Sequence, residues 1–168
     1  RRTAHSIEPT SIAGGKAMLN SINISHVFVF DQDKALDFYV GKLGLEVSND
    51  MDLGVMRWLT VRAPGDPTHD ILLEVPGAPA IDEKSAAQIR ELISKGASGF
   101  AAGFTTDSAK RTYETLKSKG VEITDELTER DYGTDFGIRD PFGNQLRVVQ
   151  LAATSHQAQP KAAAQAKR

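Results

Sequence analysis

The chain has 168 residues, of which 40% are hydrophobic and 25% are charged, and its formal net charge is -2. This length and apolar content can bury the core of one compact domain or of two small fused modules. The near balance of charge gives no electrostatic basis for binding nucleic acid or an anionic membrane, and no apolar run approaches the roughly 20 residues that cross a bilayer. Cysteine is absent, which excludes disulfides and thiolate chemistry. The N-terminus has no charged start followed by an apolar core, so we expect a cytoplasmic protein, and we expect no nucleic-acid or membrane partner.

The two ends of the chain differ in composition from its middle. Residues 1–17 carry proline, glycine, serine and threonine without periodicity and precede Met18, so we expect a disordered or vector-derived extension there. From residue 152 the sequence turns to alanine, glutamine and lysine, which predicts a disordered tail over 152–168.

Between the ends, one sequence pattern occurs twice. Asp31 and Lys34 lead to Gly-Leu-Glu-Val at 44–47, and Asp107 and Lys110 lead to Gly-Val-Glu-Ile at 120–123. In both copies an apolar strand runs into an acidic helix start, and glycine ends the helix just before the next strand. One supersecondary unit has therefore been built twice.

The first unit begins with β-branched and aromatic residues over 22–30, which predict a strand. Asp31 or Asp33 can cap the following helix, and Gly44 ends it. Further strands are expected near 45–48, 55–62 and 70–75, with a turn over 64–67. These elements make a first module over 18–77.

The second unit follows a connecting helix. Apolar residues at helical spacing predict this helix over 81–95, within a connecting segment 78–98. A strand is then expected over 99–106 and a helix over 107–119, followed by strands over 121–127, 133–139 and 145–151. The second module, 99–151, repeats the order of the first.

Two segments carry a family resemblance. Residues 33–39 with 43–47, and residues 136–144, resemble the vicinal oxygen chelate superfamily, which includes glyoxalase I, bleomycin resistance proteins, extradiol dioxygenases and fosfomycin resistance enzymes. The resemblance covers about 22–151 and implies an α+β fold of two βαβββ modules, with curved mixed sheets forming a cleft and helices outside. It also implies a homodimer.

Metal-dependent members of that superfamily take four ligands from the first and last strands of the two modules. By this resemblance, the first two positions fall on His26 and Glu74. The third falls on Ala101 or Ala102, and the fourth falls on Arg147. Alanine cannot ligate a metal, and a guanidinium is always cationic and repels a divalent ion. Two of the four ligands are lost, so we expect either no cofactor or a weakly held divalent metal.

The remaining polar residues leave several roles open. Gln150, Tyr132 or His69 could supply a further ligand to a metal on the histidine–glutamate pair. Glu74 could instead act as a catalytic base, or form an ion pair with Arg147 across the cleft. Arg147 could also receive a carboxylate or phosphate of a ligand.

Aromatic residues are the other candidates for the cleft. Trp58 and Arg57 are adjacent on one expected strand, so only one of them faces the groove, and parity alone does not say which. The expected ligand-binding residues are Phe28, Trp58, Phe104, Tyr132, Phe136 and Arg147.

Two functions of different classes follow from this pattern. Loss of two metal ligands favours a protein that binds a small, partly apolar or anionic molecule in the cleft between the modules, as bleomycin resistance proteins do. Retention of His26 and Glu74 favours the alternative, an enzyme. It would be a metal-dependent lyase or dioxygenase, or a metal-free isomerase with Glu74 as base.

Overall fold

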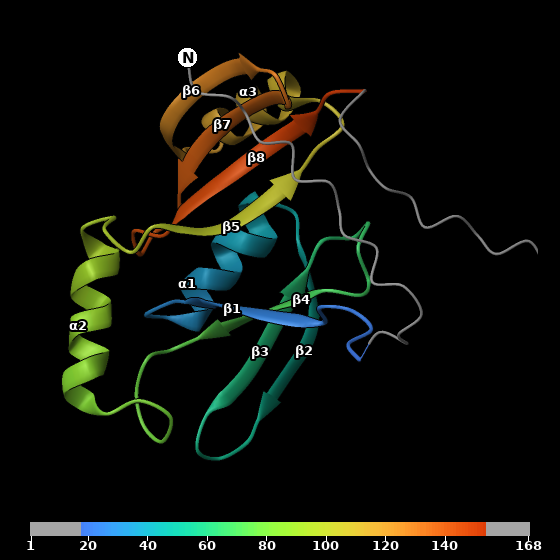
Figure 1. Ribbon diagram of the computed structural model, residues 1–168. Helices are drawn as coiled ribbons and strands as arrows, with labels where there is room; N and C mark the ends of the chain where they lie inside the picture. Colours follow the sequence, from blue (N-terminus) through green and yellow to red (C-terminus); the bar gives the residue numbers. More distant parts are fainter. Residues whose placement is uncertain (1–17, 154–168) are drawn as a thin grey trace, which may run out of the picture.

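The computed structural model describes residues 18–153 (Figure 1), so the predictions for 1–17 and 154–168 lie outside the described residues. The first unit contains β1 (Ile24–Phe28), α1 (Gln32–Leu36), η1 (Asp37–Lys42), β2 (Glu46–Asp52), β3 (Arg57–Arg62) and β4 (Asp70–Glu74). After α2 (Glu83–Ser94), the second contains β5 (Phe100–Thr105), α3 (Ala109–Ser118), β6 (Glu122–Arg130), β7 (Gly133–Arg139) and β8 (Gln145–Leu151). This order confirms the predicted α+β fold with two βαβββ modules.

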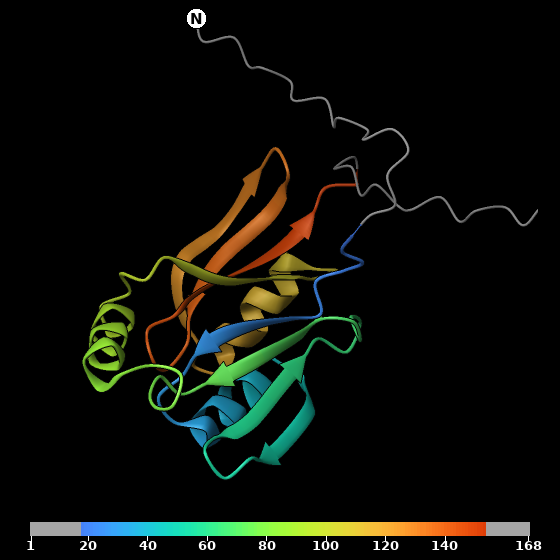
Figure 2. The ribbon, with the colours of Figure 1, turned by 60° about the horizontal axis from the view of Figure 1, so that its bottom comes forward.

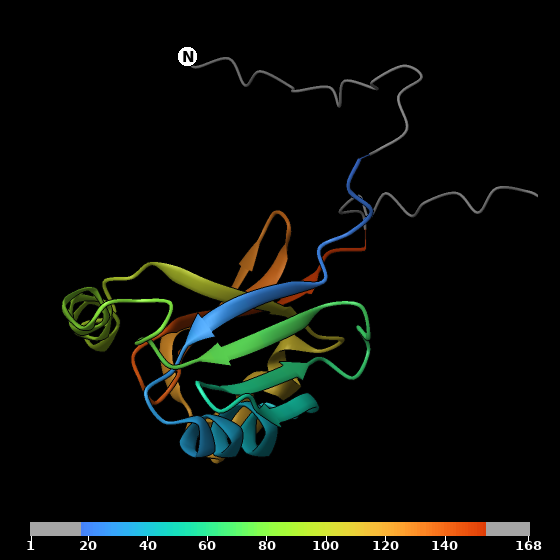
Figure 3. The same cartoon turned by 90° about the horizontal axis from the view of Figure 1, so that it is seen from below.

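Each module forms one four-stranded mixed sheet. The strand order is β1-β4-β3-β2 in the first sheet and β5-β8-β7-β6 in the second. The pairs β1–β4 and β5–β8 are parallel, and the other pairs are antiparallel. Figures 2 and 3 show the two sheets side by side, with α2 at one end of the molecule. The repeated sequence pattern therefore corresponds to a repeated strand topology.

The helix starts depend on short polar side chains. Asp31 caps α1, because its Oδ1 accepts from the backbone N–H groups of Asp33 and Lys34. The predicted start of α3 at Asp107 is wrong, because the hydroxyl of Ser108 caps that helix by accepting from Arg111 N.

No helix within 18–153 is long and apolar enough to cross a membrane.

Both modules contribute to one hydrophobic core. Alternate strand residues point into it, and η1 and α3 add side chains from the helix side of each sheet. Fully buried members include Tyr39, Leu59, Leu73, Phe136, Ile138 and Leu146. Because these residues belong to one cluster, burial of apolar surface couples the two modules.

A buried polar cluster joins the modules at the β7–β8 turn. The hydroxyl of Tyr39 donates to Asp140 Oδ2 over 2.8 Å, and Asp140 Oδ1 accepts from all three backbone N–H groups of 142–144. Asn144 Nδ2 donates to Asp140 Oδ2 and also to the carbonyl of Phe28 in β1. Burial, together with the neighbouring Asp140 carboxylate, raises the pKa of Tyr39 well above its ordinary value. The turn of one module is thereby fixed to a helix and a strand of the other.

The same turn requires glycine at position 143. Its φ is +113°, a conformation that other residues rarely adopt, and an added Cβ would lie 2.0 Å from the carbonyl oxygen of Ile93 at the end of α2. The turn therefore also packs closely against the connecting helix.

We predict that Tyr39→Phe lowers the free energy of unfolding by about 1–2 kcal/mol, because a buried hydrogen bond to a carboxylate is lost while Asn144 still donates to Asp140. Chemical denaturation measures this. Tyr113→Phe is the matched control, because that hydroxyl donates to the exposed Glu126 and its loss should cost under about 0.5 kcal/mol. Equal effects of the two substitutions would contradict a role for the buried cluster.

Candidate functional site

The predicted metal residues meet on one face of the first sheet. His26 Nδ1 lies 2.8 Å from Glu74 Oε2, and the side chains are 52% and 17% exposed. Phe28 is the Cα partner of Glu74, and its ring centroid lies 4.5 Å from that of His26. Strand alternation therefore places an imidazole, a carboxylate and an aromatic ring together on this face.

The register also shows which residue of the pair 57–58 shares this face. Thr60 is the partner of Leu72 in this antiparallel pair, so Trp58, two residues before Thr60, and Glu74, two residues after Leu72, lie on the same side of the sheet. Arg57 lies on the opposite side, where it binds Asp50 and also Asp33 of α1. Trp58 is thus the member of the pair that shares the face of the His26–Glu74 pair.

The remaining family ligand positions do not complete a metal site. Gly103 is the partner of Arg147 just as Phe28 is the partner of Glu74, but the register of β5 shifts between Phe100 and Ala102, so Ala101 has no Cα partner in β8. Ala101 and Ala102, the two candidates for the third position, both lack a side chain that can bind a metal. Among residues 18–153, no group of three or more histidine, cysteine, aspartate or glutamate side chains could hold a metal ion.

The three further ligand candidates are engaged elsewhere. Gln150 Oε1 accepts from the backbone N–H of Ala109 at the start of α3, His69 bonds to Ser25, and Tyr132 donates to Asp135. The residues present therefore do not fit the divalent metal that the fold family implies.

The second sheet carries a network of ion pairs around Asp135. Arg147 donates from Nε and Nη2 to Asp135 Oδ2 over 2.9 and 2.6 Å, and from Nη1 to Asp125 over 2.8 Å. Arg130 and Tyr132 donate to the same buried carboxylate. Of the alternatives that the sequence left open, the ion pair between Glu74 and Arg147 does not form, because each side chain has its partner within its own sheet.

This network holds Asp135 in its charged form. Burial opposes ionisation of the carboxyl, whose side chain is 2% exposed, but hydrogen bonds from Arg130, Tyr132 and Arg147 outweigh burial and lower its pKa to about 2. Four hydrogen bonds from three side chains to one nearly dehydrated carboxylate make a rigid support for β7 and β8.

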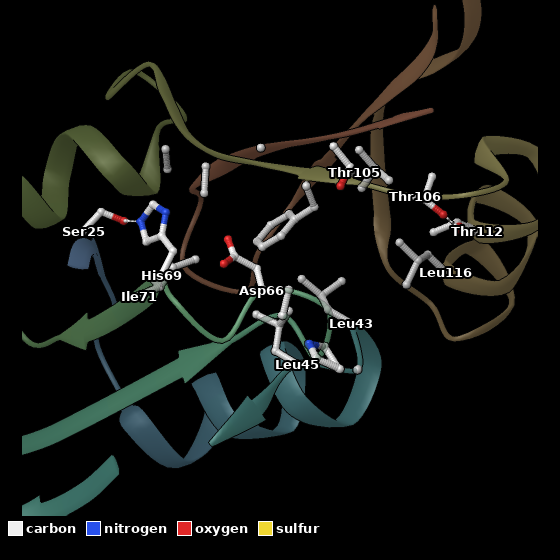
Figure 4. Close-up of a pocket in the computed structure, with 18 residues that line it drawn as sticks. Ser25, Leu43, Leu45, Asp66, His69, Ile71, Thr105, Thr106, Thr112 and Leu116 are labelled. Atoms are coloured by element: carbon white, nitrogen blue, oxygen red, sulfur yellow. Dashed lines mark hydrogen bonds between the residues drawn. The ribbon is translucent and has the colours of Figure 1, made fainter. Parts of the chain in front are cut away.

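A separate cavity of about 640 Å³ lies between the modules (Figure 4). The first module contributes the chain after η1, the β3–β4 loop and one residue each of β1 and β4. The second contributes β5 with the residue after it, α3 and one residue of β8. The apolar part of the wall consists mainly of Leu43, Leu45, Ala63, Ile71, Ala101, Ala102, Phe104, Leu116 and Val148. Ligand pockets of proteins are typically about 300–1,000 Å³ in volume and mostly apolar.

A few polar groups interrupt this apolar wall. Ser25 Oγ lies 3.0 Å from His69 Nε2 at one side of the cavity, and the hydroxyls of Thr106 and Thr112 are 2.8 Å apart at the other. Asp66 extends from the β3–β4 loop, and Figure 4 shows its carboxylate directed into the space between β5 and the first module. Such convergent polar groups can orient a bound molecule.

The expected ligand-binding residues are distributed over different places. Phe104 lines the cavity, whereas Phe136 is fully buried in the core, where its ring packs edge-on against Tyr113. Phe28 and Trp58 lie beside the His26–Glu74 pair, and Tyr132 and Arg147 belong to the network of the second sheet. Sequence reasoning missed Ser25 and Asp66, because nothing in a serine of a strand or an aspartate of a turn indicates which wall it will face.

Two modules of identical topology, a shared core and an inter-module cavity define a glyoxalase-like protein. The chain belongs to the Glyoxalase/Bleomycin resistance protein/Dioxygenase superfamily, whose model matches residues 19–148.

Similar proteins agree with this assignment. The uncharacterized protein YurT of Bacillus subtilis is 35% identical over 130 residues, covering 77% of this chain and 98% of YurT. The crystal structure of UcmS2 is 36% identical with a TM-score of 0.74, covering 79% and 98% of the two chains. TnmS3, an antibiotic binding protein from Streptomyces sp. CB03234, is 23% identical with a TM-score of 0.65 and covers 82% of this chain and all of its own. That last similarity concerns the fold alone.

The lowered pKa of Asp135 predicts a specific pH dependence of stability. Its folded pKa of about 2 lies below the ordinary 3.8, so its contribution is complete above about pH 4 and is lost as the pH falls through 2. The difference in unfolding free energy between wild type and Asp135→Asn should shrink by about 2 kcal/mol between pH 5 and pH 2. Denaturant titrations at several pH values measure it. Asp131→Asn, at an exposed turn, is the control for removal of a carboxylate outside the network. If the difference in unfolding free energy between wild type and Asp135→Asn were the same at pH 5 and pH 2, the stabilising role of the network would be contradicted.

Proposed function

We propose that the protein binds a small, largely apolar molecule in the cavity between its modules and releases it unchanged. The observation that carries this proposal is the cavity itself, about 640 Å³ in volume with walls from both modules. Its size falls in the range of ligand pockets, and its leucine, isoleucine, valine and phenylalanine side chains suit an apolar ligand.

Family membership is consistent with binding of this kind. TnmS3 carries the name of an antibiotic binding protein, so one protein of this fold has a small-molecule role, although its low identity to this chain extends the comparison to the fold only. The binding proposal for this chain rests on its own cavity. The homodimer and the cytoplasmic location expected from the sequence stay predictions.

A second candidate function is catalysis at the His26–Glu74 pair. This candidate is favoured by one observation, the 2.8 Å contact between the imidazole and the carboxylate on an accessible face of the first sheet. A carboxylate that is hydrogen bonded to an imidazole can take up and return a proton, which is the step that a metal-free isomerase with Glu74 as base requires. The cavity and this pair are different places in the molecule, so the two candidate functions can be tested separately.

Filling the cavity should weaken binding. Naphthylmethanol is a suitable neutral apolar probe, and isothermal titration calorimetry measures its affinity. We predict that Ala101→Phe, which puts a ring into the cavity, weakens binding at least about tenfold, equivalent to about 1.4 kcal/mol. Ala87→Phe makes the same change on the exposed side of α2 and should leave affinity unaltered. If wild type and both variants bind naphthylmethanol with equal affinity, the probe binds outside this cavity and the proposal is contradicted.

Metal content decides whether the His26–Glu74 pair retains a metal function. We predict substoichiometric metal in protein expressed with iron, zinc, nickel and manganese available, because two protein ligands fix a divalent ion poorly. Elemental analysis of wild type and His26→Ala measures this. Near-stoichiometric metal that disappears in His26→Ala would reverse the order of the two candidates.

A further inference from the structure

We infer that the cavity selects a molecule with an apolar body and a positively charged amine, whose ammonium group lies against the carboxylate of Asp66. This inference rests on the proposed function, since it names the class of ligand for the same cavity. It departs from the sequence-based expectation of a partly apolar or anionic ligand.

The cavity wall holds one carboxylate and neither lysine nor arginine. Of the 18 residues that line it, Asp66 and His69 have titratable side chains, and no lysine or arginine is among them. His69 shares a hydrogen bond with Ser25 through Nε2. The permanently charged group in the wall is therefore a carboxylate, which attracts a cation and repels an anion.

Asp66 is held in a conformation that leaves one oxygen for a ligand. Its Oδ1 accepts from the backbone N–H and the hydroxyl of Thr68 over 3.2 and 2.7 Å. Its Oδ2 accepts no hydrogen bond from the described residues, 18–153. The hydrogen bonds from Thr68 lower the pKa of Asp66, so the group is anionic at neutral pH. An ammonium can therefore bind a preoriented, charged acceptor.

The remaining walls suit the body of such a molecule. Phe104 adds an aromatic ring, whose face attracts a cation, and Leu45 and Leu116 add aliphatic surface. Arg147, the residue expected to receive an anion, lies outside this wall and is bound to Asp135 and Asp125. An anionic ligand would thus meet the carboxylate of Asp66 with no lysine or arginine in the cavity wall to compensate its charge.

Three probes with one ring system test the inference. Naphthylmethylammonium is cationic, naphthylmethanol is neutral and naphthylacetate is anionic. Calorimetry at neutral pH should give the cation an affinity about two- to fivefold above that of the neutral probe, and the anion the weakest affinity, as expected for an ion pair with an exposed carboxylate. Asp66→Asn removes the charge with little change of shape. It should equalise the cationic and neutral probes while leaving the affinity for naphthylmethanol unchanged.

Controls separate failure of this inference from failure of the binding proposal. Asp131→Asn removes an exposed carboxylate outside the cavity wall and should retain the preference for the cation. Equal affinities of wild type for all three probes, or a preference that survives Asp66→Asn, would overturn the charge selectivity while Ala101→Phe still blocked binding. Absence of binding by every probe, or binding that Ala101→Phe leaves intact, would overturn the proposed function and this inference with it.

Discussion

The buried carboxylate of Asp140 is the interaction on which the arrangement of the two modules depends. It accepts from three backbone N–H groups of its own turn, from the Tyr39 hydroxyl of the other module, and from Asn144, which also reaches the carbonyl of Phe28. A buried charge is costly unless hydrogen bonds satisfy it, so the modules are constrained to the position in which every donor arrives. The hydrophobic core alone is non-directional and would allow more arrangements.

The cavity follows from where this constraint acts. Asn144 ties the end of β1 at Phe28 to the second module, whereas Ser25, three residues earlier on the same strand, lines the cavity. The modules are thus closely packed near the β7–β8 turn. Toward the other end of β1 they enclose the cavity, together with the β3–β4 loop and β5. A site at the junction of two modules can change in shape through its loops while the core of each module is retained.

Local patterns in the sequence determined the order of elements, and most of that order could be predicted. Period-two alternation in 22–30 and an aspartate before a helical run identify β1 and α1, because strand faces and helix caps depend on neighbouring residues. The start of α3 differed because Ser108, next to Asp107, also has a capping side chain. The partner of Arg147 could not be predicted. Asp125, Asp135 and Glu74 are all acidic residues on strands, and only the register of β6, β7 and β8 brings the first two within reach.

The charges of this chain serve different purposes at positions that are equivalent in the repeat. Glu74 at the end of β4 pairs with an accessible histidine, whereas Arg147 on β8 is held by two carboxylates of its own sheet and stabilises that sheet. A group whose hydrogen-bonding capacity is already used within the fold binds a ligand only by exchanging partners, which costs part of the energy gained. Asp66 differs, because its hydrogen bonds to Thr68 orient the carboxylate without neutralising it. A charge that is oriented but not neutralised is the more effective determinant of which molecule enters the cavity.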